Sequence, residues 1–300
     1  MGELKATVVI ATKNRKDDLR RAIASCLKQT AAPEVLVVDD GSTDGTEAMV
    51  HREFPTVRLF RDEVSRGYIV QRNRGAELAC GDIIFSIDDD AEFISSDTIA
   101  QTLGEFSAAS IATVAIPFIN VNSSNEIRQH ASHTGTVLVT DAFTGTAYAI
   151  RRDVFLTVGG YREFLFHQGE EEDLCIRMLD KGYFTRLGNA DPIHHYESPK
   201  RDRRRMDILG ARNKILFCWY NVPIPYFFPH LAVATVNRLV FGLRTRHALL
   251  AMHGLLKGFA GCSGQAHARR PVRIKTYRLF RKLRRSRETP LDAIESQFVA

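Results

Sequence analysis

Carboxylate side chains gather at two points in the first hundred residues, each directly after a short apolar run. The first group is Asp39 and Asp40, and the second is the triplet Asp88, Asp89 and Asp90. Acids this close repel one another unless a cation or a hydrogen-bond donor neutralises them. Hard oxygen ligands suit Mg²⁺ or Mn²⁺, and such a cation commonly completes its shell with water and substrate phosphates. The two groups therefore predict a divalent cation and a nucleoside diphosphate as partners.

A third acidic group, Glu170–Asp173, opens a segment with helical spacing. Acids in the first turn of a helix are favoured by the helix dipole, so this group has a structural explanation as well as a catalytic one. The common phosphate-binding loops are absent, because no GxGxxG follows the first apolar run and no GxxxxGK[ST] occurs. Dinucleotide oxidoreductases and P-loop NTPases are therefore disfavoured. The phosphate charge must instead meet a metal and basic side chains, of which Arg66, Arg72 and Arg74 are the candidates.

Elements that could position these acids alternate along the first hundred residues. Short apolar, β-branched runs predict strands at Thr7–Thr12, Val35–Val38, Val57–Phe60 and Asp82–Ile87. Amphipathic spacing predicts helices from Asp17 to Leu27, over Thr43–His51 with Ser42 or Thr43 as the cap, and over Arg72–Ala79. This alternation implies βαβ units and a parallel sheet, in which ligands bind beyond the carboxyl ends of the strands.

The pattern changes after about residue 112. Further strands are predicted at Thr113–Val121, Gly135–Thr140 and Thr146–Ile150, and a helix at Asp173–Lys181 that Gly182 ends.

The charge of the chain is unevenly distributed. Residues 1–200 hold 21 Lys/Arg and 30 Asp/Glu, a net of −9, whereas residues 201–300 hold 20 and 5, a net of +15. A basic tail on an acidic body suggests a polyanionic surface as partner. The five scattered cysteines form no CxxC pair, which argues against a disulfide scaffold and fits a reducing compartment. No secretory signal is visible at the N-terminus.

The last hundred residues begin with the basic cluster Lys200–Arg205. Ile215–Asn237 then carries no formal charge for 23 positions, which is long enough to span a bilayer, but Pro223, Pro225 and Pro229 should break a helix there. Aromatic residues in its first half favour the headgroup zone. Leucine-rich and basic stretches at Leu231–Lys257 and Arg269–Arg287 predict amphipathic helices at a membrane interface.

Taken together, the motifs resemble the family 2 glycosyltransferases of GT-A fold. The resemblance covers roughly residues 5–200 and rests on these segments in order: VVIATKNR at 8–15, VVDDGSTD at 37–44, RNRG at 72–75, IDDD at 87–90, Gly145–Ile150, Gly159-Gly160-Tyr161, GEEEDL at 169–174 and Arg177. Each segment alone is a weak signal, but VDDGSTD, DxD, GGY and GEExDL in register are a strong one.

The resemblance implies a donor site at the strand ends. The residues that it assigns to the nucleotide sugar are Thr12, Asn14, Arg15, Asp39, Asp40, Arg72, Asp88 and Asp89. Asp39 would accept a hydrogen bond from a pyrimidine N–H, so a UDP- or dTDP-sugar is the expected donor, and Arg72 would hold the pyrophosphate. Asp90, with Asp88, would ligate Mg²⁺ or Mn²⁺. Either His194 or His195 would lie beside the metal.

The resemblance also implies the catalytic group. Glu171 falls where the family places its base, commonly an Asp, so Glu170 and Glu171 both stay open for that role, and Asp173 belongs to the same motif. A carboxylate base that takes the proton of an acceptor hydroxyl is worth roughly 10²–10⁴-fold. The metal would stabilise the leaving nucleoside diphosphate. One base and no enzyme nucleophile imply inversion at the sugar carbon.

We therefore predict an α/β protein of GT-A fold: a Rossmann-like, mixed but mainly parallel sheet sandwiched by helices, with a basic, membrane-associated helical extension. Residues 1–110 would form the nucleotide-sugar half, 111–205 the acceptor and catalytic half, and 206–300 the extension. The acceptor would be a glycan or a lipid-linked group in polysaccharide, glycolipid or cell-envelope assembly. The enzyme is expected in the cytoplasm, peripheral at the inner face of an anionic membrane, with no nucleic-acid partner.

Two alternatives remain at this stage. A nucleotidyltransferase that makes an activated sugar shares the architecture, but it normally needs a glycine-rich loop where this chain has Ala11–Arg15. The other alternative is a sugar-binding or membrane-binding protein that kept the fold without catalysis, against which the intact set of acids argues.

Overall fold

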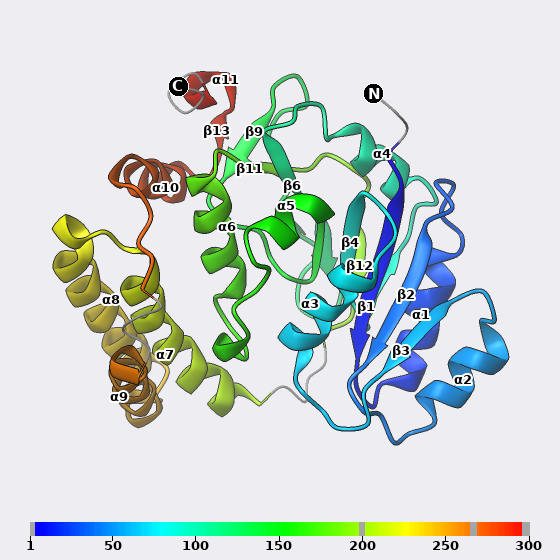
Figure 1. Cartoon of the computed structure of the whole chain (residues 1–300), viewed down its shortest axis with the longest axis horizontal. Helices are drawn as coiled ribbons and strands as arrows, with labels where there is room; N and C mark the ends of the chain where they lie inside the picture. The colour runs from blue at the N-terminus through cyan, green and yellow to red at the C-terminus, as the bar shows by residue number, and fades with distance from the viewer. Residues whose placement is uncertain (1–3, 198–201, 265–268, 296–300) are drawn as a thin grey trace.

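The protein is described by a computed structural model, which covers residues 4–197, 202–264 and 269–295. Its main sheet has nine strands in the order β13-β9-β11-β6-β10-β4-β1-β2-β3 (Figure 1). The strands of this sheet are β1 (Ala6–Thr12), β2 (Glu34–Asp39), β3 (Arg58–Arg61), β4 (Ile83–Asp88), β6 (Ile111–Ala115), β9 (Leu138–Thr140), β10 (Ala147–Arg151), β11 (Phe184–Leu187) and β13 (Thr289–Pro290). A second sheet has the order β5-β12-β7-β8, with β5 (Ala91–Phe93), β7 (Phe118–Asn120), β8 (Ile127–Arg128) and β12 (Ile193–His195).

Helices cover both faces of the main sheet. On one face, the side chains of α1 (Lys16–Cys26), α2 (Thr46–Glu53) and α4 (Thr98–Gly104) meet inward residues such as Val8 and Ile10. On the other face, α3 (Tyr68–Leu78), α5 (Arg152–Thr157) and α6 (Glu170–Asp180) meet residues such as Val9. A short 3-10 helix, Glu163–Leu165, precedes α6. The predicted α/β sandwich with a mainly parallel sheet is therefore confirmed, since β1 pairs in parallel with both β2 and β4.

Three predicted helices start three or four residues from the expected position, including α6, which begins at Glu170 and not at Asp173. Helix α2 begins at Thr46 after Gly45, whose φ is 86°, so neither Ser42 nor Thr43 is its cap. The reason is that Ser42 Oγ accepts a hydrogen bond from the Asn14 backbone N–H, while the Thr43 N–H donates to Asn14 Oδ1. Both residues tie the loop after β2 to the loop after β1. Helix α3 begins at Tyr68, four residues before the predicted start at Arg72.

The predicted strand Thr113–Val121 is wrong as a single element. It is interrupted at Pro117, which has no backbone N–H to donate to a ladder. Strand β6 stays in the main sheet, between β10 and β11, whereas β7 joins the second sheet beside β12. This switch between sheets brings β12 and its histidines to the carboxyl end of β4, because β12 also pairs with β5 directly after the acidic triplet.

The C-terminal region is helical and returns to the main sheet. Its elements are α7 (Arg203–Asn221), α8 (Ile224–Arg244), α9 (Ala248–Gly264), α10 (Ile274–Ser286), β13 and α11 (Asp292–Glu295). The expected proline break lies at Val222–Pro223, but Pro225 falls in the first turn of α8 and Pro229 lies inside that helix. Strand β13 pairs with β9 at the edge of the main sheet. Of the basic cluster Lys200–Arg205, residues 200 and 201 lie outside the described residues.

Helix α9 packs closely on α7 through glycines. A Cβ at Gly254 would overlap the carbonyl oxygen of Ile208, and one at Gly258 would lie 2.7 Å from the Cβ of Ile215. This glycine face is buried against α7, which turns the opposite face of α9 outward. No helix among the described residues is long and apolar enough to cross a bilayer.

Candidate functional site

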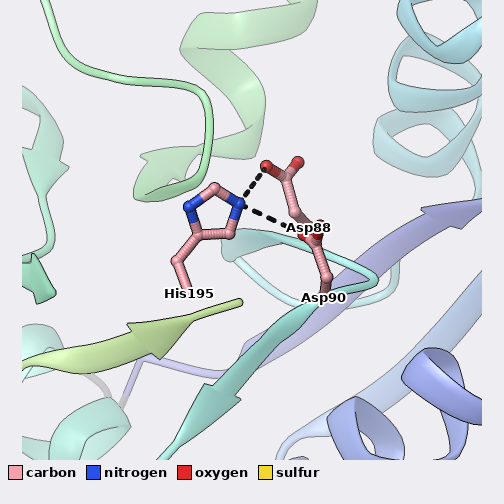
Figure 2. A group of neighbouring side chains, drawn as sticks. All are labelled: Asp88, Asp90 and His195. Atoms are coloured by element: carbon pink, nitrogen blue, oxygen red, sulfur yellow. Dashed lines mark ion pairs between the residues drawn. The ribbon is translucent and has the colours of Figure 1, made fainter. Parts of the chain in front are cut away.

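Three side chains from β4, the turn after it, and β12 converge at the carboxyl end of the sheet (Figure 2). Asp88 ends β4, Asp90 lies in the turn before β5, and His195 is held opposite Ala91 by the pairing of β12 with β5. Nε2 of His195 lies 3.2 Å from Oδ1 of Asp90 and 3.7 Å from Oδ2 of Asp88. One ligand atom from each residue lies within 4.8 Å of the others, which is a spacing that suits one metal ion.

The second oxygen of each carboxylate is bound by an arginine. Arg15 donates from Nη1 to Asp90 Oδ2 at 2.7 Å, and Arg72 donates from Nη2 to Asp88 Oδ1 at 2.7 Å. Burial alone would raise the pKa of Asp90, but its interactions with His195 and then with Arg15 lower it to about 2. Each acid therefore turns one free oxygen toward the imidazole, and Asp90 is ionised at neutral pH.

The imidazole of His195 is oriented as a metal ligand would be. Its Nδ1 lies 2.6 Å from Oδ1 of Asn120 in β7, and an amide oxygen can only accept, so Nδ1 carries the proton. Nε2 is then the ring nitrogen that faces the acids, where a metal ion can take the place of a proton, and it makes no geometric hydrogen bond to a described residue. Metal-bound histidines usually donate their other N–H to such an oxygen. The donor set of one imidazole and two carboxylates thus fits a divalent cation.

His194 does not join this cluster. Successive side chains of a strand point to opposite faces, so only one of the two histidines of β12 can face Asp90. The ring of His194 lies instead against Tyr196, with 6.2 Å between centroids. Of the two histidines that the sequence left open, the structure therefore places His195 at the acids.

Asp89 faces away from Asp88 and Asp90, toward the loop after β1. Its Oδ2 accepts from Thr12 Oγ1 at 2.7 Å and its Oδ1 from Arg15 at 2.8 Å. Burial raises the pKa of Asp89 to about 6, although Arg15 and Thr12 oppose that shift. Asp89 thus joins the loop after β1 to the turn after β4, and it positions Arg15 against Asp90.

Asp39, at the end of β2, has an unused oxygen in a buried position. Its side chain is fully buried, Oδ1 accepts from the Ser42 N–H at 3.0 Å, and Oδ2 makes no hydrogen bond with any residue that the structure describes. The nearest cation to Oδ2 is Nε of Arg61, at 3.4 Å. Asn14 lies beside this point with a φ of 53°, and its side chain holds Thr43. A free acceptor at the junction of β1 and β2 can receive an N–H of a bound ligand.

Asp40 serves the neighbouring loop instead. Its two oxygens accept from Ser65 Oγ, Gln71 Nε2 and the backbone N–H groups of Arg66 and Gly67. Burial would raise the pKa of Asp40, but these hydrogen bonds lower it below the ordinary value. No oxygen of Asp40 is left for a ligand, so we read it as the residue that shapes the loop before α3.

Glu171 lies next to Arg72, at a point where the chain leaves room only for glycine. A Cβ at Gly145 would overlap Oε1 of Glu171 and would lie 2.8 Å from Nη1 of Arg72. Arg72 also donates to the Gly145 carbonyl at 2.8 Å and to Asp88, so this guanidinium lies between Gly145 and the acidic cluster. Burial raises the pKa of Glu171, against the opposing charge of Arg72. A carboxylate with a raised pKa beside the acidic cluster is suited to accept a proton.

The other acids of the same turn are engaged elsewhere. Glu170 accepts a short hydrogen bond from the Tyr68 hydroxyl, and burial followed by the charge of Glu171 raises its pKa well above the ordinary range. Asp173 accepts from Arg162 at 2.6 Å and from Arg177 at 2.9 Å. Because Arg177 also binds the carbonyls of Val158 and Gly160, Asp173 holds the GGY turn in place and does not face the cluster.

Several residues that shape the site gave no signal in the sequence. Asn120 lies 75 positions from its partner His195, and Arg61 and Tyr68 reach their acids from separate loops. The two other predicted phosphate ligands lie apart from the cluster: Arg66 pairs with Asp62, and Arg74 pairs with Glu77. Only the break at Pro117 could have indicated that a second sheet carries the histidines.

Comparison with known proteins gives one family. Residues 7–166, more than half of the chain, match the family model described as glycosyl transferase family 2. Among solved structures, a mannosyltransferase of Pyrobaculum calidifontis, PcManGT, in complex with GDP-Man and Mn²⁺, superimposes with a TM-score of 0.60. The match is 18% identical and covers 86% of this chain and 88% of that one. At this sequence identity, the structural similarity establishes only that the two proteins share a fold.

Two curated relatives extend the comparison. An uncharacterized glycosyltransferase of Haemophilus influenzae is 25% identical over 198 residues, which are 62% of this chain and 66% of the relative. The glucosyl-dolichyl phosphate glucuronosyltransferase of Haloferax volcanii is 27% identical over 206 residues, which are 59% of this chain and 64% of the relative. The chain thus spans just under two thirds of the length of these relatives.

Proposed function

Since the chain belongs to glycosyl transferase family 2, we propose that it transfers a sugar from a nucleoside diphosphate sugar to an acceptor hydroxyl, with a divalent cation and with inversion. The observation that carries this proposal is the cluster of Asp88, Asp90 and His195, in which a buried imidazole nitrogen and two carboxylate oxygens face one another without hydrogen bonds between them. The family match argues against the nucleotidyltransferase alternative.

Asp39 is the proposed recognition point for the donor base. Its buried, unused Oδ2 would accept an N–H from the base, which a pyrimidine such as uracil or thymine offers at N3. A UDP- or dTDP-sugar is therefore the proposed donor. Thr12 and Asn14 flank this point from the end of β1, and Arg15 and Arg72 would meet the diphosphate from either side of the acidic cluster.

Glu171 is the proposed base. Glu170 is nearly inaccessible and accepts a hydrogen bond from the Tyr68 hydroxyl, whereas Glu171 is half-buried and lies, like Arg72, against Gly145. Glu171 would take the proton of the acceptor hydroxyl as that oxygen attacks the sugar carbon. Mg²⁺ or Mn²⁺ held by Asp88, Asp90 and His195 would supply Lewis-acid stabilisation of the leaving diphosphate. With a single base and no side chain proposed as nucleophile, attack in line with the leaving group inverts the anomeric centre.

A lipid-linked acceptor in polysaccharide, glycolipid or cell-envelope assembly fits the rest of the chain best. The relative from Haloferax volcanii is named for a dolichyl phosphate substrate, and residues 201–300 of this chain carry a net charge of +15. We propose that the C-terminal helices hold the enzyme at the cytoplasmic face of an anionic membrane. Binding to anionic liposomes that weakens with salt would support this, and equal binding to neutral liposomes would oppose it.

A thermal-shift screen tests the donor. The protein is heated with UDP-, dTDP- and GDP-sugars, each with Mn²⁺ and with EDTA. A true donor raises the melting temperature by mass action, and the shift should need Mn²⁺. Asp39→Asn keeps the volume of the side chain but offers an N–H to the ligand, so it should lose the UDP shift. An equal shift in that variant would remove Asp39 from the base site.

A further inference from the structure

A groove of about 740 Å³ lies between α8 and α10, apart from the acidic cluster. None of its lining residues belongs to the cluster, and Figure 1 shows α8 and α10 on the far side of α6 from β4 and β12. The groove is therefore not part of the site described above, and the proposed sugar transfer gives it no role.

The wall that α8 contributes is uncharged. Its residues are spaced i, i+3, i+4 and i+7 and so form one stripe of the helix: Tyr226, Pro229, His230 and Val233. Burial, and next the charge of Arg281, lowers the pKa of His230 to about 4, so this imidazole is neutral near pH 7. Its Nδ1 lies 2.7 Å from the Tyr277 hydroxyl on α10, and both residues line the groove.

The wall that α10 contributes is cationic with the same spacing. Its residues are Arg278, Arg281, Lys282 and Arg285. Within residues 4–197, 202–264 and 269–295, no carboxylate comes within ion-pair distance of these four cations. By contrast, Arg284 on another face of the same helix pairs with Asp141 and Glu172. Four cations in one stripe are thus without a carboxylate partner in the described part of the chain, and an anion would relieve their mutual repulsion.

Exposed apolar side chains also lie outside the groove, on α8 and α9. On α8, Phe228 is 70% exposed, and Val236 and Leu243 are exposed as well. On α9, the face opposite the glycines presents Leu249, Met252, Leu256 and Phe259, of which Leu249 is 75% exposed. Exposed apolar side chains in this number mark a contact with another apolar phase.

We propose that the groove between α8 and α10 binds the phosphate headgroup of an anionic membrane lipid, with the hydrocarbon chain along α8. The cations of α10 would pair with the phosphate, and Tyr226, Pro229 and Val233 would contact the first part of the chain. Charge complementarity selects this occupant, since one wall is apolar and the other is cationic. The groove would then be a specific site for one lipid molecule, as distinct from non-specific electrostatic attraction of the protein to a charged membrane surface.

The test measures binding of dodecyl phosphate, as monomers below its critical micelle concentration, to the full-length protein by isothermal titration calorimetry. Saturable binding at one site is expected, with inorganic phosphate and the neutral amphiphile dodecyl maltoside each binding at least about tenfold more weakly. Replacing Lys282→Gln and Arg285→Gln together should weaken dodecyl phosphate binding by roughly tenfold or more, because each cation near a lipid headgroup contributes to the affinity. Both side chains are exposed, so the fold should be kept, which the melting temperature checks.

The control is the double variant Lys28→Gln and Lys181→Gln, which removes the same charge from exposed positions outside the groove and should bind as the unchanged protein does. A second variant, Val233→Glu, places a carboxylate in the apolar wall and should also weaken binding. Equal affinity for inorganic phosphate would mean a simple anion site and would overturn the proposal. Equal affinity for dodecyl maltoside, or an unchanged affinity for dodecyl phosphate in both groove variants, would also overturn the proposal. No binding of dodecyl phosphate would overturn it too, and is the result expected if the groove binds an acidic protein segment.

Discussion

Four consecutive acids at the start of α6 have four different surroundings. Glu170 bonds to Tyr68, Glu171 lies against Gly145, Glu172 pairs with Lys214 and Arg284, and Asp173 pairs with Arg162 and Arg177. One turn of a helix points successive side chains about 100° apart, so they enter separate environments. The motif could be identified from the sequence, but the partners of its acids lie on distant elements. Only those partners show which acid can act as a base and which acid belongs to a structural ion pair.

Replacement of Glu171 by Gln should abolish most sugar transfer. The amide keeps the shape but cannot take the acceptor proton, so kcat should fall by roughly 10²–10⁴-fold. Glu170→Gln is the matched control, because Glu170 is buried and bonded to the Tyr68 hydroxyl, so this variant should lose little activity. Turnover is measured as nucleoside diphosphate released, with folding checked by circular dichroism. The reverse pattern would assign the base to Glu170.

The pH profile should report the same residue. Burial raises the folded-state pKa of Glu171, and the base acts in its ionised form. Activity should therefore be complete well above that pKa and should fall as the pH drops through it. The acid limb of kcat/KM is expected above the ordinary glutamate pKa of about 4.3. An acid limb at or below that value would contradict the assignment.

At the scale of elements, the loop between β9 and β10 approaches the site more closely than its sequence suggests. Gly145 lies against both Glu171 and Arg72, and any Cβ would overlap the carboxylate. Gly145→Ala should therefore displace Glu171 or Arg72 and reduce kcat by at least about tenfold, while the fold is kept. Gly135→Ala is the control, since no atom lies within 4 Å of a Cβ there. Equal activity of the two variants would show that this contact does not position the base.

The elements also show where sequence patterns fail. Three of the parallel strands could be predicted because β1, β2 and β4 are continuous apolar runs buried on both faces. Strand β12, which contains His195, is only three residues long and pairs with β5 and β7. It is too short for a periodic sequence pattern to predict it. Helix α8 includes Pro229 in its interior, where proline is unfavourable for a helix. Packing of α8 against the rest of the C-terminal helices compensates for it.

At the scale of the molecule, Glu172 joins three elements. It pairs with Lys214 of α7 and Arg284 of α10, and those two cations lower its pKa from 4.5 to about 2 against the effect of burial. The charge split of the sequence predicted a separate basic extension. In the structure part of that charge is neutralised by the body, and β13 adds a strand to its sheet. A net charge does not show which cations are paired, so the packing of the C-terminal region against the main sheet could not be predicted.

Glu172→Gln should destabilise the whole fold by roughly 1–3 kcal/mol, less than a fully buried pair because both cations are about one-third exposed. A lowered folded-state pKa contributes stability above the unfolded value of about 4.5 and loses it as the pH falls toward 2. The difference in melting temperature between the two proteins should therefore be large at pH 7 and should shrink below pH 4.5. Glu77→Gln, which breaks an exposed pair with Arg74, should change stability by less than about 0.5 kcal/mol. If the melting temperatures of Glu172→Gln and the unchanged protein differed by the same amount at pH 7 and below pH 4.5, the stabilising role of the Glu172 ion pairs would be contradicted.

The central claim is that Asp88, Asp90 and His195 hold a cation that assists sugar transfer. The most direct measurement follows the products released from nucleotide sugars and an acceptor mixture, with Mn²⁺ or EDTA, for the unchanged protein and for Asp90→Ala. We expect a nucleoside diphosphate in the presence of Mn²⁺, and a near-complete loss of turnover in EDTA or in the variant. Release of pyrophosphate, or undiminished turnover in EDTA, would contradict the account.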